Sequence, residues 1–217
     1  MNFQTIMAKP FVEKADQIQN VFSQTENVKQ SEQSGQIDPS LNEKIAYIKN
    51  TCPKKIKNAS KYRIKKPNLL LLILLHEDIS KIYSDSMGSR SENLEKMKAI
   101  KEDFLTLALI GDRALEMGIL PNIWEDEKKS RDIPLKGDLD AHKKRFVENK
   151  NLAKIWDFLD LYDNKILTKK KKESQKLRAS RMEAVFGIIY LESGLESVEN
   201  AIRYLKCNYE KNHNNDS

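Results

Sequence analysis

The sequence predicts an all-α protein, and three observations support this fold class. Charged residues make up 32% of the 217 positions and aromatic residues only 7%, a mixture rich in Lys, Glu and Leu that favours helices. Apolar residues recur at helical spacing, as at Leu152, Ile155, Trp156 and Leu159. No segment shows the sustained alternation of apolar and polar residues that predicts a strand.

The first sixty residues differ from the rest in composition. Residues 12–40 are dominated by Gln, Ser, Asn, Glu and Lys, and their apolar residues are too sparse to define a helical face. We therefore expect a polar N-terminal arm over residues 1–60, partly disordered or loosely helical and including a short helix at Leu41–Asn50. A helical domain over 61–210 and a disordered tail over 211–217 complete the expected organisation.

The other elements follow from apolar spacing and helix-end signals. The basic stretch CPKKIKNASKYRIKKP, from residue 52, is interpreted as a solvated linker in preference to a nucleic-acid contact. Asn68 is the expected N-cap of the apolar helix that follows it. A helix is expected from Ser91 to Leu120, kinked near Gly111 and stopped at Pro121, and a charged loop is expected over 121–137. Further helices are expected over 139–149 and from 152 onward. Two final helices should be joined near Ser193 and Gly194.

Charge, cysteine content and hydropathy limit the function classes. The formal net charge of +6 permits a polyanionic partner without requiring one. Cys52 and Cys207 are distant in sequence and have no metal-ligand spacing around them, which favours free thiols in a reducing compartment. The longest apolar run, Leu69–Leu75, is far shorter than the roughly 18 residues needed to span a bilayer. We expect a cytoplasmic protein with no membrane association.

Three acidic residues lie in strongly apolar surroundings. Asp112 directly follows Gly111 within LALIGDRALEMGIL, Glu116 lies one helical turn later, and Glu183 begins the apolar stretch EAVFGIIYLE. A buried carboxylate costs several kcal/mol unless it is paired or bound to a metal. Acids at i and i+4 repel each other unless a cation such as Mg²⁺ or Mn²⁺ lies between them. Helix capping and ion pairs are the alternative, with bases available at Arg113, Arg178 and Arg181.

Three segments resemble the catalytic domain of the ribonuclease III family. LALIGDRALEMGIL is similar to the family's signature helix, and RMEAVFGIIYLESGLESVENAI resembles its later metal-binding helix. KGDLDAHKKRFVENKNLAKIWDFLDL resembles the region between them. The segments come in the family's order and extend over roughly residues 68–205. No double-stranded-RNA-binding domain is expected to follow them.

The family's acidic cluster is reduced in this chain. Leu105, Ala108, Lys136 and Ser180 stand where the full-length enzymes have carboxylates. The Mini-III ribonucleases have a similarly reduced pattern, and the comparison with them retains Asp112, Glu116 and Glu183 as the catalytic set. The match is to that pattern and not to the subfamily, because this chain has a longer GDLDAHKKRF region and an N-terminal arm.

The resemblance implies a metal-dependent endoribonuclease, a hydrolase of RNA processing that acts on double-stranded or structured RNA. It implies Mg²⁺ (or Mn²⁺) bound by Asp112 and Glu183, and a homodimer with the signature helix at its two-fold axis. The alternative is a catalytically inactive ribonuclease III fold that binds RNA or a ribonucleoprotein as an assembly module. The expected phosphate contacts are Lys143, Lys144, Arg145, Lys169, Lys170, Lys171 and Lys172.

Overall fold

The computed structural model describes residues 3–25, 41–75, 91–129, 133–161 and 173–213. Every regular element in these ranges is a helix, which confirms the all-α prediction. The helices are α1 (Phe3–Thr25), α2 (Leu41–Asn50), α3 (Cys52–Ser60), α4 (Leu69–Leu74), α6 (Ser91–Glu127), α7 (Lys136–Val147), α8 (Asn149–Leu159) and α9 (Gln175–His213). None of these helices is both long and apolar enough to cross a membrane.

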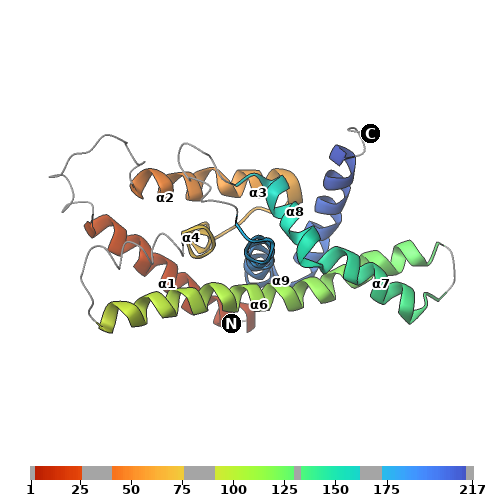
Figure 1. Ribbon diagram of the computed structural model, residues 1–217, viewed down its shortest axis with the longest axis horizontal. Helices are drawn as coiled ribbons and strands as arrows, with labels where there is room; N and C mark the ends of the chain where they lie inside the picture. Colours follow the sequence, from red (N-terminus) through yellow and green to blue (C-terminus); the bar gives the residue numbers. More distant parts are fainter. Residues whose placement is uncertain (1–2, 26–40, 76–90, 130–132, 162–172, 214–217) are drawn as a thin grey trace.

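The first half of α9 forms the centre of the fold. It is seen nearly end-on in Figure 1, with the short helix α4 beside it and the long helix α6 crossing below. Helices α1, α3 and α8 also contact α9. All seven residues from Leu69 to Leu75 are at most 4% exposed, so α4 is buried on every side. The core is therefore built around α9 and α4, with α6 as its longest partner.

The N-terminal segment contributes directly to this core. Apolar residues of α1 recur on one helical face, and Ala8, Phe11, Ala15 and Ile18 are at most 8% exposed. The helix contacts α9, α4 and α2. Residues 26–40, the most polar part of the expected arm, lie outside the described residues, as does the end of the expected tail. The division of the chain at residue 60 remains a prediction.

The stretch predicted as a basic linker begins with a helix, so that prediction was wrong for residues 52–60. Cys52, Ile56 and Ser60 recur every four residues and are at most 2% exposed, while Lys54 and Lys57 between them are exposed. The Ser60 hydroxyl donates a hydrogen bond to the Ile56 carbonyl, at 2.7 Å. An amphipathic helix with a basic outer face produces the same high Lys content as a solvated linker.

Helix α6 is longer than the sequence predicted. It continues through Gly111 without a break and through Pro121 to Glu127, so the expected kink, stop and start of the charged loop were wrong. Proline removes one helical hydrogen bond, yet Ile119 and Ile123 on either side of Pro121 are at most 4% exposed. Burial of these side chains offsets the lost bond, and the Asn122 amide donates to the Gly118 carbonyl at 3.4 Å.

The other helix ends agree with the sequence more closely. Helix α2 has the predicted bounds, and the predicted junction near Ser193 is present at Gly194, whose φ of 79° interrupts α9. A glycine tolerates this backbone conformation because it has no Cβ. Asn68 precedes α4 but makes no side-chain cap, and its amide donates to Asp16 instead, at 2.5 Å. The expected continuation of α4 beyond Leu75 lies outside the described residues.

Candidate acidic site at the crossing of α6 and α9

Two glycines bring the backbones of α6 and α9 into direct contact. A Cβ added to Gly111 would lie 1.7 Å from the carbonyl oxygen of Glu183, and one added to Gly187 would lie 2.3 Å from that of Leu107. Both distances are far shorter than any real Cβ contact, so only glycine fits at either position. Gly111 therefore serves the approach of two helices, and this approach puts Asp112 beside Glu183.

The two acids at the crossing are electrostatically coupled. Burial raises the pKa of Glu183 to about 7, and the negative charge of Asp112 adds to this effect. A hydrogen bond from the Ser180 hydroxyl and the charge of Lys176 act in the opposite direction on the Glu183 pKa. Burial and the charge of Glu116 raise the pKa of Asp112, while Arg113 lowers it. The site is thus rich in negative charge and poor in compensating cations.

Glu116 has a different environment. Its carboxylate forms an ion pair with Arg113 at 2.8 Å, which is the structural role considered for it from the sequence. The same guanidinium lies 3.8 Å from the Asp112 carboxylate, at the outer limit of an ion pair. Across the described residues, no three His, Cys, Asp or Glu side chains are arranged to hold a metal ion. The structure therefore couples Asp112 with Glu183 and leaves Glu116 bound to its neighbour.

The two arginines near Glu183 bind other acids. Arg178 of α9 pairs with Asp157 of α8, and Arg181, which is only 2% exposed, pairs with Glu173. Arg181 also lies 5.9 Å from the centre of the Trp156 ring. These contacts fasten α9 to α8 and to the segment before it. The hypothesis that Arg178 or Arg181 neutralises Glu183 is not supported by these contacts.

Asp112 is less buried than the sequence indicated. Its side chain is 35% exposed, because one face of α6 is open. Leu107, Ala114, Leu115 and Ile119 pack into the core as expected, whereas Leu109 is 57% exposed. The strongly apolar sequence around Asp112 predicts burial on most faces of the helix, and that expectation was wrong. The apolar residues of one long helix are divided between the core and an exposed surface.

A comparison with known proteins identifies the domain around this crossing. The profile of the ribonuclease III domain family matches residues 105–194, which contain both glycines and all three acids. Residues 105–194 therefore form a ribonuclease III domain. Ribonuclease 3 of Campylobacter jejuni is 26% identical over 161 residues, which cover 71% of this chain and 62% of that protein. The match therefore covers less than two thirds of that relative. The comparison with solved structures found none that matches the present chain.

The four positions at which the resemblance predicts lost carboxylates lie on three helices, α6, α7 and α9. Leu105 is 40% exposed on α6, Ala108 is 5% exposed, and Lys136 is the first residue of α7. Ser180 takes part in the site as the hydrogen-bond donor to Glu183. A serine at this position can orient a carboxylate but brings no negative charge. The site is consequently less acidic than the family's full set would make it.

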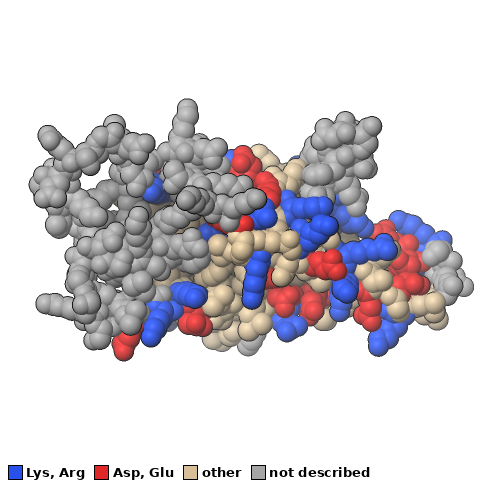
Figure 2. Space-filling view, in the orientation of Figure 1, with Lys and Arg blue, Asp and Glu red and all other residues tan. Residues whose placement is uncertain are grey.

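The basic residues proposed as phosphate contacts are only partly described. Lys144 and Arg145 are exposed on α7, and Lys143 lies 4.0 Å from Asp140 on the same helix. The run Lys169 to Lys172 lies outside the described residues. On the face drawn in Figure 2, basic and acidic side chains are interspersed over the described surface. This distribution does not single out one broad basic surface for RNA.

Two contributors to the site were missed at the level of sequence. Gly187 was not singled out, although it lies four residues after Glu183, on the same face of a helix and in an otherwise bulky apolar run. Ser180 was noted only as a lost acid, although it lies three residues before Glu183 and so on the same face. In both cases the helical spacing from Glu183 was the available signal.

Proposed function

We propose that the protein is a metal-dependent endoribonuclease acting on double-stranded or structured RNA. The single observation that carries this proposal is the coupling of Asp112 and Glu183 across the Gly111–Gly187 contact. Carboxylates kept at close range with raised pKa values are a common property of catalytic sites. The family of the domain and the Ribonuclease 3 relative support the same class of reaction.

The donor set fits a divalent cation. Mg²⁺ and Mn²⁺ prefer carboxylate oxygens, and a cation between Asp112 and Glu183 would relieve the conditions that raise their pKa values. Asp112 and Glu183 would hold the ion, with Ser180 orienting the Glu183 carboxylate. When bound, such an ion supplies a polarised water and stabilises negative charge during phosphodiester hydrolysis. With two carboxylates, binding should be weak and should require a high metal concentration.

A homodimer through α6 is part of the proposal. Five large apolar side chains of this helix are at least 36% exposed and lie within about 120° of one another around its axis. They are Leu105, Leu109, Met117, Leu120 and Trp124. Several large apolar side chains exposed on one side of a helix are typical of a protein interface. A two-fold axis on this exposed stripe of α6 would place one Asp112–Glu183 pair in each subunit near the interface.

The RNA would be recognised by its backbone and shape, because A-form helices offer proteins little access to base edges in the deep groove. Lys143, Lys144 and Arg145 on α7 remain the proposed phosphate contacts among the described residues. A cytoplasmic location is also proposed. Cys52 is buried and Cys207 is exposed, and both are free thiols, as is usual in a reducing compartment.

One observation favours the alternative, an inactive assembly module that binds RNA or a ribonucleoprotein. Glu116 is already neutralised by Arg113 at 2.8 Å, and the described residues contain no group of three metal ligands. Under this alternative, Asp112 and Glu183 would have no catalytic role. The basic residues of α7 would then act in binding alone.

The test is cleavage of an end-labelled RNA duplex by the full chain, across a series of Mg²⁺ and Mn²⁺ concentrations. Asp112→Asn and Glu183→Gln should each lower the cleavage rate at least 100-fold, because each removes a charge from the cation site. Asp126→Asn, on the same helix but outside the site, is the matched control and should leave the rate unchanged. Duplex binding without cleavage at any metal concentration would support the assembly module instead.

A further inference from the structure

A cavity of about 380 Å³ lies away from the acid pair, between the C-terminal part of α6 and helices α7, α8 and α9. This volume lies within the usual range of small-molecule sites, roughly 300–1,000 Å³. Four helices contribute to its wall, so its shape depends on their packing. The lining residues are Ile119, Ile123, His142, Arg145, Phe146, Asn151, Ile155 and Lys206.

The walls of the cavity are mainly apolar. Ile119, Ile123 and Ile155 are each at most 4% exposed, and Phe146 packs against the same core. Such walls cannot replace the hydration shell of a small inorganic ion, and binding one there would carry a large desolvation cost. An occupant must therefore bring an apolar body of its own to fill the space.

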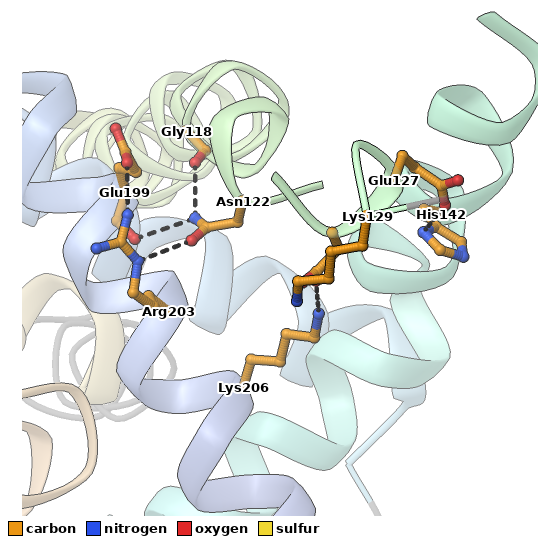
Figure 3. Close-up of polar contacts among 9 residues, drawn as sticks. Gly118, Asn122, Glu127, Lys129, His142, Glu199, Arg203 and Lys206 are labelled. Atoms are coloured by element: carbon orange, nitrogen blue, oxygen red, sulfur yellow. Dashed lines mark hydrogen bonds and ion pairs between the residues drawn. The ribbon is translucent and has the colours of Figure 1, made fainter. Parts of the chain in front are cut away.

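The rim of the cavity carries three basic side chains, and two of them are already paired. His142 lies 2.7 Å from Glu127, and Figure 3 shows these two side chains next to each other. Lys206 lies 2.8 Å from Asp126. For Arg145, no carboxylate among the described residues lies within ion-pair distance. The Asn151 amide donates a hydrogen bond to the Arg145 carbonyl, which fixes the backbone that carries this guanidinium. Within the described part of the chain, Arg145 is thus the rim cation that lacks a counter-charge.

We propose that this cavity binds a small amphipathic monoanion, an organic acid with an apolar body and one carboxylate. The apolar body would contact Ile123, Phe146 and Ile155, while the carboxylate would accept hydrogen bonds from Arg145. A neutral hydrocarbon would leave the guanidinium without a partner. The cavity does not depend on the proposed cleavage reaction, although Arg145 is also one of the proposed phosphate contacts.

The probe for this site is 8-anilinonaphthalene-1-sulfonate, which combines an apolar ring system with a single negative charge. Titration of the full chain, followed by fluorescence, should show one saturable site. Arg145→Gln should weaken the affinity about tenfold, because a charged hydrogen bond is lost. Lys144→Gln, one residue away and not in the cavity wall, is the matched control and should leave the affinity unchanged.

Two further variants separate this cavity from the exposed stripe of α6, which could also bind an apolar dye. Ile123→Trp fills the cavity and should abolish the saturable site, whereas Leu109→Ser in the stripe should leave it intact. If Ile123→Trp does not fold, the surface variant Arg145→Gln still decides the question. An affinity unchanged by Arg145→Gln, or a site lost in Leu109→Ser, would overturn the proposal.

Displacement of the dye identifies the class of acid. Octanoate represents an aliphatic carboxylate and 3-phenylpropanoate an aromatic one, and displacement by either supports the proposal and indicates the preferred body. Displacement by neither overturns it. The displacing acid should also raise the melting temperature of the wild-type protein more than that of Arg145→Gln, because a ligand stabilises the state that binds it.

Discussion

Carboxylates in the two halves of the α6–α9 pair have pKa values shifted in opposite directions. Near the C-terminal end of α6, Asp126 lies 2.9 Å from Lys129 and 2.8 Å from Lys206, and these contacts lower its pKa to about 2. At the glycine crossing, burial and neighbouring negative charge raise the pKa of Glu183 to about 7. The same two helices thus carry one carboxylate stabilised by two lysines and one whose negative charge is disfavoured by burial.

This difference separates a carboxylate paired with cations from carboxylates that lack such compensation within one scaffold. The chain has 38 basic residues against 32 acidic ones, so bases were available to neutralise the crossing. Arg178 and Arg181 instead bind Asp157 and Glu173. Acids that remain undercompensated in such a sequence are candidates for binding an external cation. The effects of substitutions should therefore differ between the glycine crossing and the paired end of α6, where Asp126 contacts Lys129 and Lys206.

The largest effect is expected from the glycine contact. Gly111→Ala would force a Cβ to within 1.7 Å of the Glu183 carbonyl oxygen, and a backbone atom cannot move aside as a flexible side chain can. We expect a loss of about 3 kcal/mol in the free energy of unfolding, at the upper end of overpacking effects. Urea denaturation followed by circular dichroism measures this change.

Gly137→Ala is the matched control for that substitution. Gly137 lies in the first turn of α7, and no atom approaches within 4 Å of a Cβ placed there. Alanine should therefore be neutral or stabilise the protein by about 0.5–1 kcal/mol, as expected from helix propensity. Equal effects of the two substitutions would mean that the close contact of α6 with α9 does not exist in solution.

Periodic apolar spacing predicted the all-α fold and most helix positions, whereas the family of the domain was predicted from the resemblance of three segments. The sequence also indicated that Asp112 and Glu183 belong to one site, although only through the family resemblance. Helix-breaking residues gave wrong helix ends where tertiary contacts determine how far the helix extends. Gly111 and Pro121 are helix breakers in isolation, yet α6 continues through both. Ile119 and Ile123 on either side of Pro121 are buried, and α9 packs so closely against Gly111 that only a glycine fits there.

Partner selection among charges could not be predicted from spacing. Arg181 is two residues from Glu183, but residues at i and i+2 point to different sides of a helix, and the buried guanidinium pairs with Glu173. Which base neutralises which acid depends on how α8 and α9 pack. The exposed stripe on α6 likewise requires knowledge of which of its apolar residues the core leaves uncovered. Neither property is encoded within a single helical segment.

A pH-dependent effect of intermediate size is expected at the crossing. Between pH 4.5 and 7 the folded protein binds a proton at Glu183 that the unfolded chain has released, so wild-type stability falls as the pH rises through this window. Glu183→Gln removes this dependence. The variant should match wild type near pH 4 and exceed it at pH 8 by on the order of 1 kcal/mol, allowing for screening by solvent.

Thermal unfolding of both proteins at each pH measures the difference. Mg²⁺ added at pH 8 should raise the melting temperature of the wild type and have less effect on Glu183→Gln, since the cation needs the carboxylate. Glu199→Gln on the same helix is the control, because Arg203 already neutralises Glu199 at 2.9 Å. Parallel pH profiles for wild type and Glu183→Gln would contradict the raised pKa.

A smaller effect is expected at the paired end. Lys206→Gln leaves Asp126 with only the Lys129 contact, and the partly exposed pair should be worth at most about 1 kcal/mol at pH 7. Because the folded pKa of Asp126 is depressed, its stabilising effect is present above pH 3.8 and is lost as the pH falls through about 2. Wild type and variant should converge in acid. A constant difference in unfolding free energy down to pH 2 would show that the lysine acts by packing alone.

The smallest change in stability is expected for Arg113→Gln, because this arginine is 67% exposed. Its effect on metal binding should be easier to detect. Arg113 is the base nearest to both Asp112 and Glu116, at 3.8 and 2.8 Å, and it competes with any cation for their charge. Its removal should strengthen Mn²⁺ binding about two- to threefold, as measured by titration calorimetry. Arg203→Gln, at the paired end, should leave Mn²⁺ affinity unchanged, and weaker Mn²⁺ binding by Arg113→Gln would instead assign the arginine a role in orienting the acids.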